Sequence, residues 1–114
     1  MIRREDSGEI AILHVTTSSL DEVVAAAIEA ACQPPHPIIV LDFSEVLFIN
    51  SAGISALLRW AVTMLKGGVK LFALNVNPHH QKLFQTVELA RFIPAIQERD
   101  LVTYRTHSQH NPGV

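Results

Sequence analysis

Cysteine is almost absent from this sequence: Cys32 is the single thiol in 114 residues. One thiol cannot form an intrachain disulfide or supply a cysteine metal site, so we expect Cys32 to be a small buried residue near a helix end. No segment approaches the roughly 18 apolar residues that span a membrane. The N-terminal charges are not followed by the apolar run of a secretory signal. We therefore expect a cytoplasmic protein without membrane insertion.

Charge and ligand motifs are also scarce. Charged residues make up 18% of the chain and the net charge is −2, so there is no basic excess for binding nucleic acid. Gly67-Gly68 lacks the later Gly-Lys-Ser/Thr of a phosphate-binding loop. Six histidines are present, but His79-His80 and the pair His107 and His110 lack supporting ligands. We predict no metal site and no cofactor.

What the sequence does contain is a high apolar fraction, 48%, which indicates a folded chain with one core. We expect a single domain over residues 1–106 and a polar tail over residues 107–114. Apolar periodicity predicts strands at 9–15, 38–43 and 70–76, and helices at 20–31, 52–66 and from 78 onward. Ser7-Gly8 predicts a hairpin that pairs residues 2–5 with 9–15. Residues 95–104 are compatible with a short strand followed by a helical turn, or with an edge strand at 101–104.

Helix boundaries follow from capping residues. Ser19 and Glu22 fit a capping box at the start of the first helix. Asn77 is a predicted cap with Pro78 at the first helical position of the third. Strand 38–43, helix 52–66 and strand 70–76 form a right-handed βαβ unit with parallel strands. The predicted fold class is therefore α/β, a small mixed, mostly parallel sheet of about four to five strands with helices packed on it.

Ser51 lies where a polar turn enters the helix at 52–66. Backbone N–H groups at a helix start are unpaired and the helix dipole favours negative charge, so a phosphate is easily accommodated there. Ser51 is therefore either a phosphoacceptor or simply a capping or first-turn residue. A catalytic nucleophile is not expected, because Ile49 stands where a nucleophile elbow needs glycine and no His–acid pair is evident.

The residues around Ser51 suggest a surface for a partner. Asn50 either tolerates a strained turn or replaces an aspartate in a hydrogen-bonding role. Gly53 indicates a close backbone approach, or room for a partner's loop. The apolar stripe predicted to face the core consists of Ile54, Leu57, Leu58, Ala61, Val62 and Leu65. The opposite face carries Ala52, Ala56, Trp60 and Thr63, flanked by Arg59 and Met64.

That opposite face predicts a flat docking surface with Trp60 exposed at one end, although Trp60 could instead pack on a neighbouring helix or loop. Asp42 and Ser44 are expected to cap the corner that follows strand 38–43. Small residues leading from Ser51 to Trp60 would join the modification site to the docking surface.

Residues 41–58, LDFSEVLFINSAGISALL, resemble the signature of STAS domains. This family includes the bacterial anti-sigma factor antagonists and also domains appended to sulfate transporters. Its members have a hydrophobic strand that ends in Asp, a short corner, and Asp-Ser-x-Gly opening an apolar helix. The equivalent here is Asn50-Ser51-Ala52-Gly53, and the resemblance covers about residues 9 to 100.

The resemblance implies a non-enzymatic regulator of transcription that binds an anti-sigma factor, a serine kinase-like protein, and is released when Ser51 is phosphorylated. The partner-binding residues it implies, together with the helix face, are Asn50, Ala52, Gly53, Ala56, Arg59 and Trp60. Two features depart from the family pattern: Asn50 replaces the usual Asp, and the loop at residues 14–19 lacks the usual signature. The alternative is a constitutive adaptor subunit of a transport or signalling complex, in which Ser51 has no switching role. An oligomeric state is not specified by the sequence.

Overall fold

The computed structural model describes residues 1–102, so the predicted tail at 107–114 and the domain limit at residue 106 lie outside the described residues. A five-stranded sheet has the order β1-β2-β4-β6-β7, in which β1 is antiparallel to β2 and the other neighbours are parallel. Its strands are β1 (Ile2–Ser7), β2 (Ile10–Val15), β4 (Ile38–Asp42), β6 (Lys70–Leu74) and β7 (Ala95–Ile96). This architecture confirms the predicted α/β class and its mostly parallel sheet.

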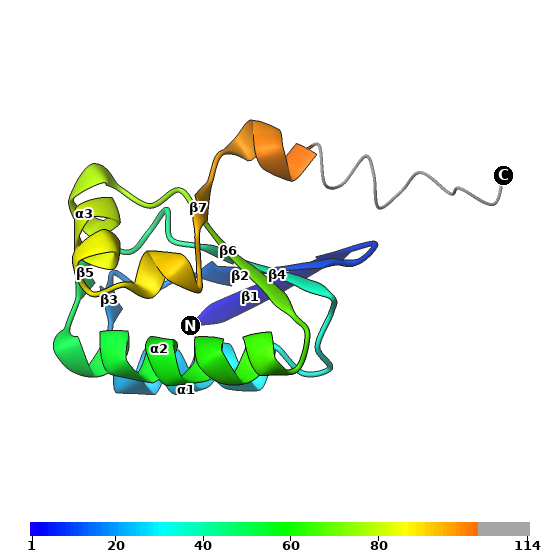
Figure 1. Cartoon of the computed structure of the whole chain (residues 1–114), viewed down its shortest axis with the longest axis horizontal. Helices are drawn as coiled ribbons and strands as arrows, with labels where there is room; N and C mark the ends of the chain where they lie inside the picture. Colours follow the sequence, from blue (N-terminus) through cyan, green and yellow to red (C-terminus); the bar gives the residue numbers. More distant parts are fainter. Residues whose placement is uncertain (103–114) are drawn as a thin grey trace, which may run out of the picture.

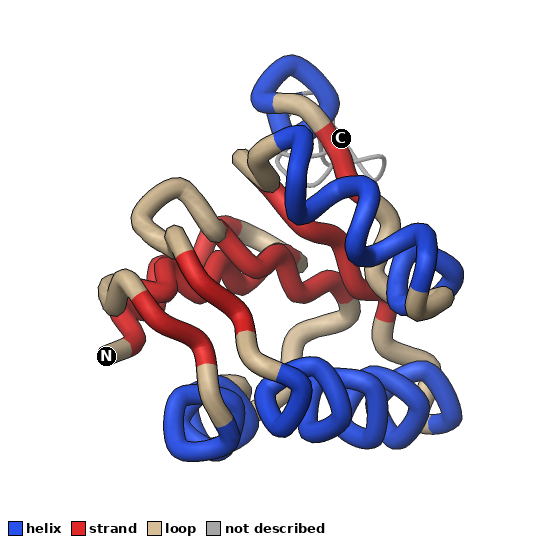
Figure 2. Tube along the Cα trace, turned by 90° about the vertical axis from the view of Figure 1, so that its left-hand side faces the viewer, coloured by secondary structure: helices blue, strands red, loops and turns tan. Residues whose placement is uncertain are grey.

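A second, two-stranded parallel sheet pairs β3 (Ser19–Leu20) with β5 (Phe48–Ile49). The helical elements before β7 are α1 (Glu22–Ala31), α2 (Ser51–Lys66), α3 (Pro78–Thr86) and the 3₁₀ turn η1 (Leu89–Arg91). Figure 1 shows α1 behind α2 beneath the large sheet, and Figure 2, turned by 90°, shows the two helices next to each other on that side of the sheet. The two helices therefore cover one face of the sheet.

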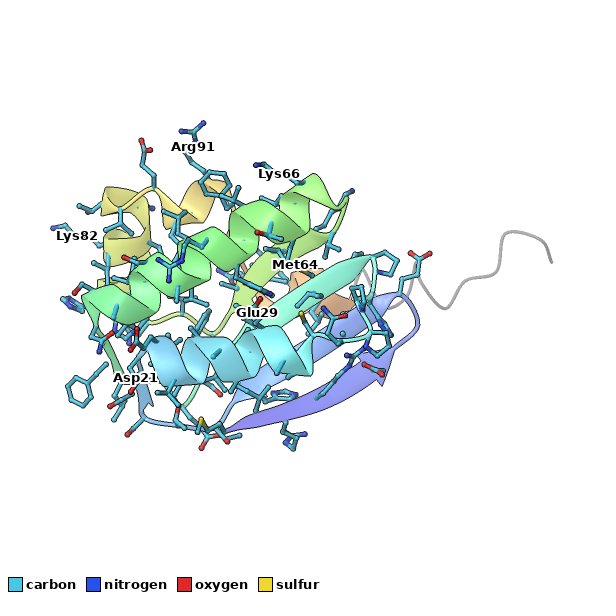
Figure 3. The ribbon with its side chains drawn as sticks, turned by 90° about the horizontal axis from the view of Figure 1, so that it is seen from below. Asp21, Glu29, Met64, Lys66, Lys82 and Arg91 are labelled. Atoms are coloured by element: carbon cyan, nitrogen blue, oxygen red, sulfur yellow. The ribbon has the colours of Figure 1, made fainter. Side chains whose placement is uncertain are left out.

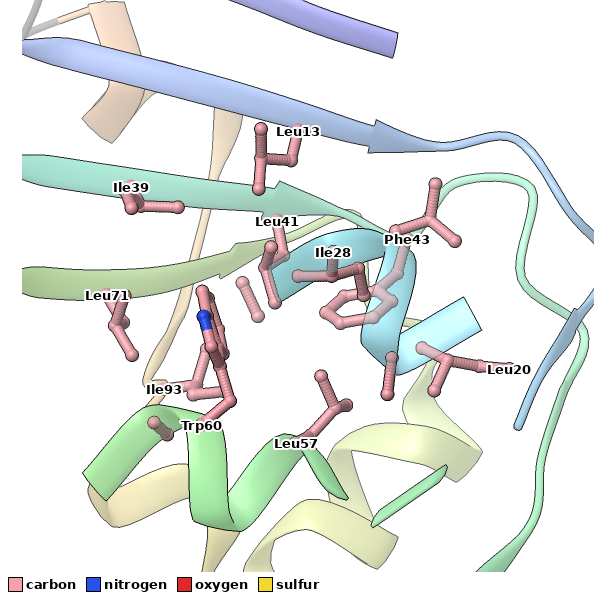
Figure 4. Close-up of a cluster of buried hydrophobic side chains, with 14 of the residues drawn as sticks. Leu13, Leu20, Ile28, Ile39, Leu41, Phe43, Leu57, Trp60, Leu71 and Ile93 are labelled. Carbon is pink, nitrogen blue, oxygen red and sulfur yellow. The ribbon is translucent and has the colours of Figure 1, made fainter. Parts of the chain in front are cut away.

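The main core fills the space between that face and the two helices. Leu13, Leu41 and Leu71 from the strands meet Ile28 of α1 and Leu57 of α2, and all five side chains are buried (Figure 4). A smaller cluster lies on the other face of the sheet and consists of Ile10, Ile12, Ile38, Val40, Leu74 and Leu101. Burial on both faces explains the continuous apolar run of β4, as expected for a central parallel strand.

Several local predictions are confirmed. β1 and β2 form the expected hairpin, with Gly8 at a φ of 61° in the turn. Cys32 is buried next to the end of α1. The side chain of Asn77 caps α3 by accepting a hydrogen bond from the His80 amide at 2.8 Å. The segment after Pro94 forms the short strand β7 and then a helical turn at residues 98–102, which excludes an edge strand beginning at 101.

The predicted capping box at the start of α1 is wrong. Asp21 is the N-cap, and its carboxylate accepts a hydrogen bond from the Val24 amide at 2.9 Å. Ser19 is part of β3, where it pairs with Phe48. The strand pairing therefore takes Ser19 out of the helix, and the next residue able to cap is Asp21.

The orientation of α2 also differs from the prediction. Its buried residues are Gly53, Leu57, Trp60 and Ala61, whereas Ile54 and Leu58 are only partly buried. Trp60 is 5% exposed and extends from α2 toward the sheet in Figure 4, so the predicted exposed tryptophan is wrong. The physical reason is area: turning α2 to bury an indole removes more apolar surface from water than burying Leu58 would. The indole Nε1 is buried with no hydrogen-bond partner among the described residues.

A close backbone contact fixes where α2 begins. The Leu20 carbonyl oxygen of β3 accepts a hydrogen bond from the Asn50 amide at 3.2 Å. A Cβ atom added to Gly53 would lie 2.5 Å from the same Leu20 oxygen. The prediction that Gly53 permits a close backbone approach is confirmed, and the neighbour is the chain's own β3.

We expect Gly53→Ala to lower the free energy of unfolding by about 1–3 kcal/mol, because the new methyl group collides with backbone that cannot rotate away. Urea unfolding followed by circular dichroism measures the effect. Gly67→Ala is the matched control, since its Cβ would lie 3.4 Å from the nearest atom, the Met64 carbonyl oxygen. Equal stability of the two variants would contradict this account.

Candidate functional site

Ser51 is the first residue of α2 and its side chain is exposed. Asn50 is the N-cap, with φ −90° and ψ 170°, and its side-chain oxygen accepts a hydrogen bond from the Gly53 amide at 2.7 Å. The backbone of Asn50 is ordinary extended chain, so the predicted strained turn is wrong. Asn50 instead fills the hydrogen-bonding role, since a capping site needs only a side-chain oxygen and asparagine caps about as well as aspartate.

The start of α2 favours an anionic group. The Gly53 and Ile54 amides are bonded to Asn50, while the Ser51 and Ala52 amides occupy positions with no intrahelical acceptor. The first turn carries no acidic side chain. A negative charge on the Ser51 hydroxyl would therefore meet the positive end of the helix dipole without a carboxylate beside it.

Two large apolar side chains that shortly precede Ser51 in the sequence are exposed. Leu47 is 61% exposed and Phe48, the first residue of β5, is 67% exposed. Their amides donate hydrogen bonds to the Ser18 carbonyl at 2.7 and 3.0 Å, so the backbone beneath the two side chains is held in place. Neither side chain was predicted from the sequence to belong to a site. A two-residue strand is too short to show by alternation which side faces water.

The predicted docking residues fall into two places. Ala52 is exposed beside Ser51, whereas Gly53 is buried against Leu20. Ala56, Arg59 and Trp60 line a groove between α1 and α2 with a volume of about 370 Å³. The remaining residues that line the groove are Glu22, Ala25, Ala26, Glu29 and Thr63. One continuous exposed face from Ser51 to Trp60 is therefore not formed.

A polar cluster joins the carboxyl ends of three parallel strands. His14 Nδ1 lies 2.6 Å from a carboxylate oxygen of Asp42, and His14 Nε2 lies 3.3 Å from Glu5 Oε1. The other Asp42 oxygen accepts hydrogen bonds at 3.0 Å from the Asn75 side chain and the Ser44 amide. The expected cap of the strand corner by Asp42 is confirmed. The pairing with His14 was missed, because 28 residues separate the two and only the register of β2 with β4 brings them together.

The Asp42 carboxylate is stabilised as an anion. Burial raises the pKa of Asp42, but hydrogen bonds from Asn75, His14 and Ser44 outweigh burial and hold the pKa below its usual value. Asn75 reaches Asp42 from a left-handed backbone conformation, φ 59°, which asparagine tolerates better than most residues. Within residues 1–102, no hydrogen bond connects this cluster to Ser51, so it forms no nucleophile–base pair with that hydroxyl.

No group of three or more His, Cys, Asp or Glu side chains among the described residues could hold a metal ion. His80 is buried with its Nδ1 3.1 Å from the side-chain nitrogen of Asn77, and burial, followed by the nearby His79, lowers the pKa of His80. No helix within residues 1–102 is long and apolar enough to cross a bilayer.

Known proteins share this fold. A family model described as STAS domain matches residues 6–108. The anti-sigma factor antagonist SpoIIAA in its unphosphorylated form has a TM-score of 0.71 and 20% identity, covering 97% of this chain and 100% of that chain. The phosphorylated form of SpoIIAA, a Bacillus cell fate determinant, has a TM-score of 0.67 and 19% identity, covering 91% and 98%.

An anti-sigma factor antagonist from Mycobacterium paratuberculosis has a TM-score of 0.73 and 22% identity, covering 93% of each chain. No curated protein is similar enough in sequence to match. At these identities the structural likeness establishes a shared fold. The family model is separate evidence from the sequence, and it matches nearly the whole chain.

We expect Asp42→Asn to lower the free energy of unfolding at pH 7 by about 1–3 kcal/mol, because hydrogen bonds to a charged group are replaced by weaker ones. Folding lowers the pKa of Asp42, so the ionised carboxylate stabilises the fold at a pH above its pKa in the unfolded chain, about 4. This stabilisation is lost as the pH falls through the pKa of Asp42 in the folded chain. The stability difference between wild type and Asp42→Asn should therefore shrink between about pH 5 and pH 2.

Urea unfolding at a series of pH values measures this difference, with Glu45→Gln as the control for an exposed carboxylate in the following loop. A gap between wild type and Asp42→Asn that stays constant down to pH 2 would show that ionisation of Asp42 does not stabilise the fold.

Proposed function

Because the chain belongs to the STAS domain family, we propose that it is an anti-sigma factor antagonist whose binding to a serine kinase-like anti-sigma factor is switched by phosphorylation of Ser51. The observation that carries the proposal is the exposed Ser51 at the start of α2, which follows the exposed side chains of Leu47 and Phe48 closely in the sequence. In this role the chain binds a protein and catalyses no reaction.

The docking surface in this proposal consists of Leu47, Phe48, Ser51 and Ala52, with Asn50 holding the helix start beneath it. Covering a large apolar side chain contributes about 1.5–3 kcal/mol, so Leu47 and Phe48 together supply enough apolar area to anchor a partner. The hydrogen bonds from their amides to Ser18 fix the strand that presents them. Less conformational entropy is then lost on binding.

The switch is a phosphoryl transfer from ATP. The γ-phosphoryl group is transferred to Ser51 Oγ, ADP leaves, and the hydroxyl proton is released. The product carries about −1.5 to −2 additional charges at the centre of the docking surface. A partner that covered this group would have to remove its water, so binding weakens. The need for ATP also assigns the chain to the cytoplasm.

Asn50 is compatible with this switch. It keeps the cap that holds Ser51 at the first helical position, and it places no carboxylate beside the developing phosphate. SpoIIAA, which has the same fold, is known in both a phosphorylated and an unphosphorylated form, and this supports the proposal for Ser51.

We expect incubation with ATP and the cognate kinase-like anti-sigma factor to add one phosphoryl group to wild type and none to Ser51→Ala. Intact-mass spectrometry measures the gain. Ser55→Ala, which removes an exposed hydroxyl one turn along α2, is the matched control and should be modified like wild type. Modification of Ser51→Ala to the same extent would overturn the assignment of Ser51.

We expect Phe48→Ala to weaken binding of the unphosphorylated chain to that anti-sigma factor by about 10- to 100-fold, the loss typical of a buried aromatic anchor. Isothermal titration calorimetry measures the affinity. Val102→Ala is the control, because it truncates an exposed apolar side chain elsewhere on the molecule. Val102 is 56% exposed and Phe48 is 67% exposed. If Phe48→Ala binds like wild type, the docking surface lies elsewhere on the molecule.

A further inference from the structure

The outer face of α1 is unusually apolar for a helix in contact with solvent. Val23 is 58% exposed, and Ala26 and Ala30 are also exposed. The helix contains no lysine or arginine, and its charged residues are Glu22 and Glu29. An exposed helix normally places long charged side chains toward water, so a row of small apolar residues there suits close packing against another helix.

The groove between α1 and α2 continues this surface. Ala25 and Ala26 on one side and Ala56 on the other keep the groove open, because none of them has a side chain long enough to fill it. Figure 3 views the molecule from this side and shows α1 and α2 lying together with Glu29 at the boundary between them. The groove is therefore an open channel between two neighbouring helices.

The two rims of the groove carry opposite charge. Glu22 and Glu29 line the α1 side, and Arg59 lines the α2 side. Within residues 1–102, none of these three side chains forms an ion pair or a side-chain hydrogen bond. Each rim therefore offers charges that a partner can pair.

This charge arrangement is complementary to itself. Both helices connect neighbouring parallel strands, so α1 and α2 run in the same direction. A two-fold axis parallel to the groove sets α1 of one copy on α2 of the other, and the glutamate rim then meets the arginine rim twice. A two-fold axis across the groove would instead set the two glutamate rims against each other.

We propose that a second copy of this chain docks in the α1–α2 groove, forming a symmetric dimer in which Arg59 of each copy faces Glu22 and Glu29 of the other. The alanines of the two grooves allow the helices to approach closely, and Val23 adds apolar area at the edge. The interface uses residues other than Leu47, Phe48 and Ser51, so it goes beyond the proposed switch and does not depend on it.

Sedimentation equilibrium of the full chain over a concentration series tests the dimer. We expect the average mass to rise from 12.6 kDa toward twice that value as concentration increases. Arg59→Glu should raise the dissociation constant at least about tenfold, because like charges then face each other twice in the interface. The double variant Glu22→Arg/Glu29→Arg should do the same.

Mixing the two charge-reversed proteins should restore a dimer, now a heterodimer, because the acidic and basic rims are complementary again. Lys66→Glu makes the same charge change outside the groove and should leave the equilibrium of wild type unchanged, while circular dichroism verifies that every variant is folded. A wild-type chain that remains monomeric at all concentrations overturns the proposal. Failure of the mixture to associate also overturns it, as does an Arg59→Glu protein that dimerises like wild type.

Discussion

The contact between Gly53 and the Leu20 carbonyl is the constraint on which the exposed surface depends. The Leu20 oxygen accepts a hydrogen bond from the Asn50 amide and also occupies the space that a side chain at position 53 would fill. The β3–β5 pair and the first turn of α2 are thereby joined at one atom. Because Asn50 also caps the helix, α2 has one place to begin, and Ser51 follows at its first position.

The loop that carries Leu47 and Phe48 is held at both ends. At its start, Asp42 is fixed by His14, Asn75 and the Ser44 amide. At its end, Asn50 is fixed by Leu20 and Gly53. Between these points the backbone is bonded to Ser18 through the Leu47 and Phe48 amides. Large apolar side chains can stay exposed on such a loop because the backbone beneath them is already ordered.

Much of the fold follows from local sequence. The long strands and helices have clear apolar periods, and the Asn77-Pro78 start of α3 is determined by its own residues. Periodicity did not predict which face of α2 is turned toward the sheet, because two overlapping stripes on this helix are both apolar. The indole of Trp60 decides between them through its larger buried area. Ser19 and Asp21 are likewise both able to cap α1, and the distant pairing of Ser19 with Phe48 decides that choice.

The site was only partly predictable for the same reason. Ser51, Asn50 and Gly53 are adjacent in sequence, so a local motif was enough to identify the helix start. His14 with Asp42 depends on the register of β2 with β4, and the exposure of Phe48 depends on a two-residue strand. Neither leaves a periodic signal in the sequence. The parts of the site that could not be predicted are therefore those that depend on the pairing of short segments or of segments far apart in the sequence.

Charge at the start of α2 bears on how a phosphate on Ser51 would act. The first eight residues of α2 contain no lysine or arginine, and Arg59 lies two turns further along. The helix amides and water would therefore be the groups that solvate the phosphate in the free chain, with no side-chain cation of α2 to draw it inward. A phosphate that stays at the surface leaves the fold as it is and changes what a partner meets there. Its effect on affinity would then come from the water that the partner must remove, which costs most where the same partner also covers apolar side chains such as Leu47 and Phe48.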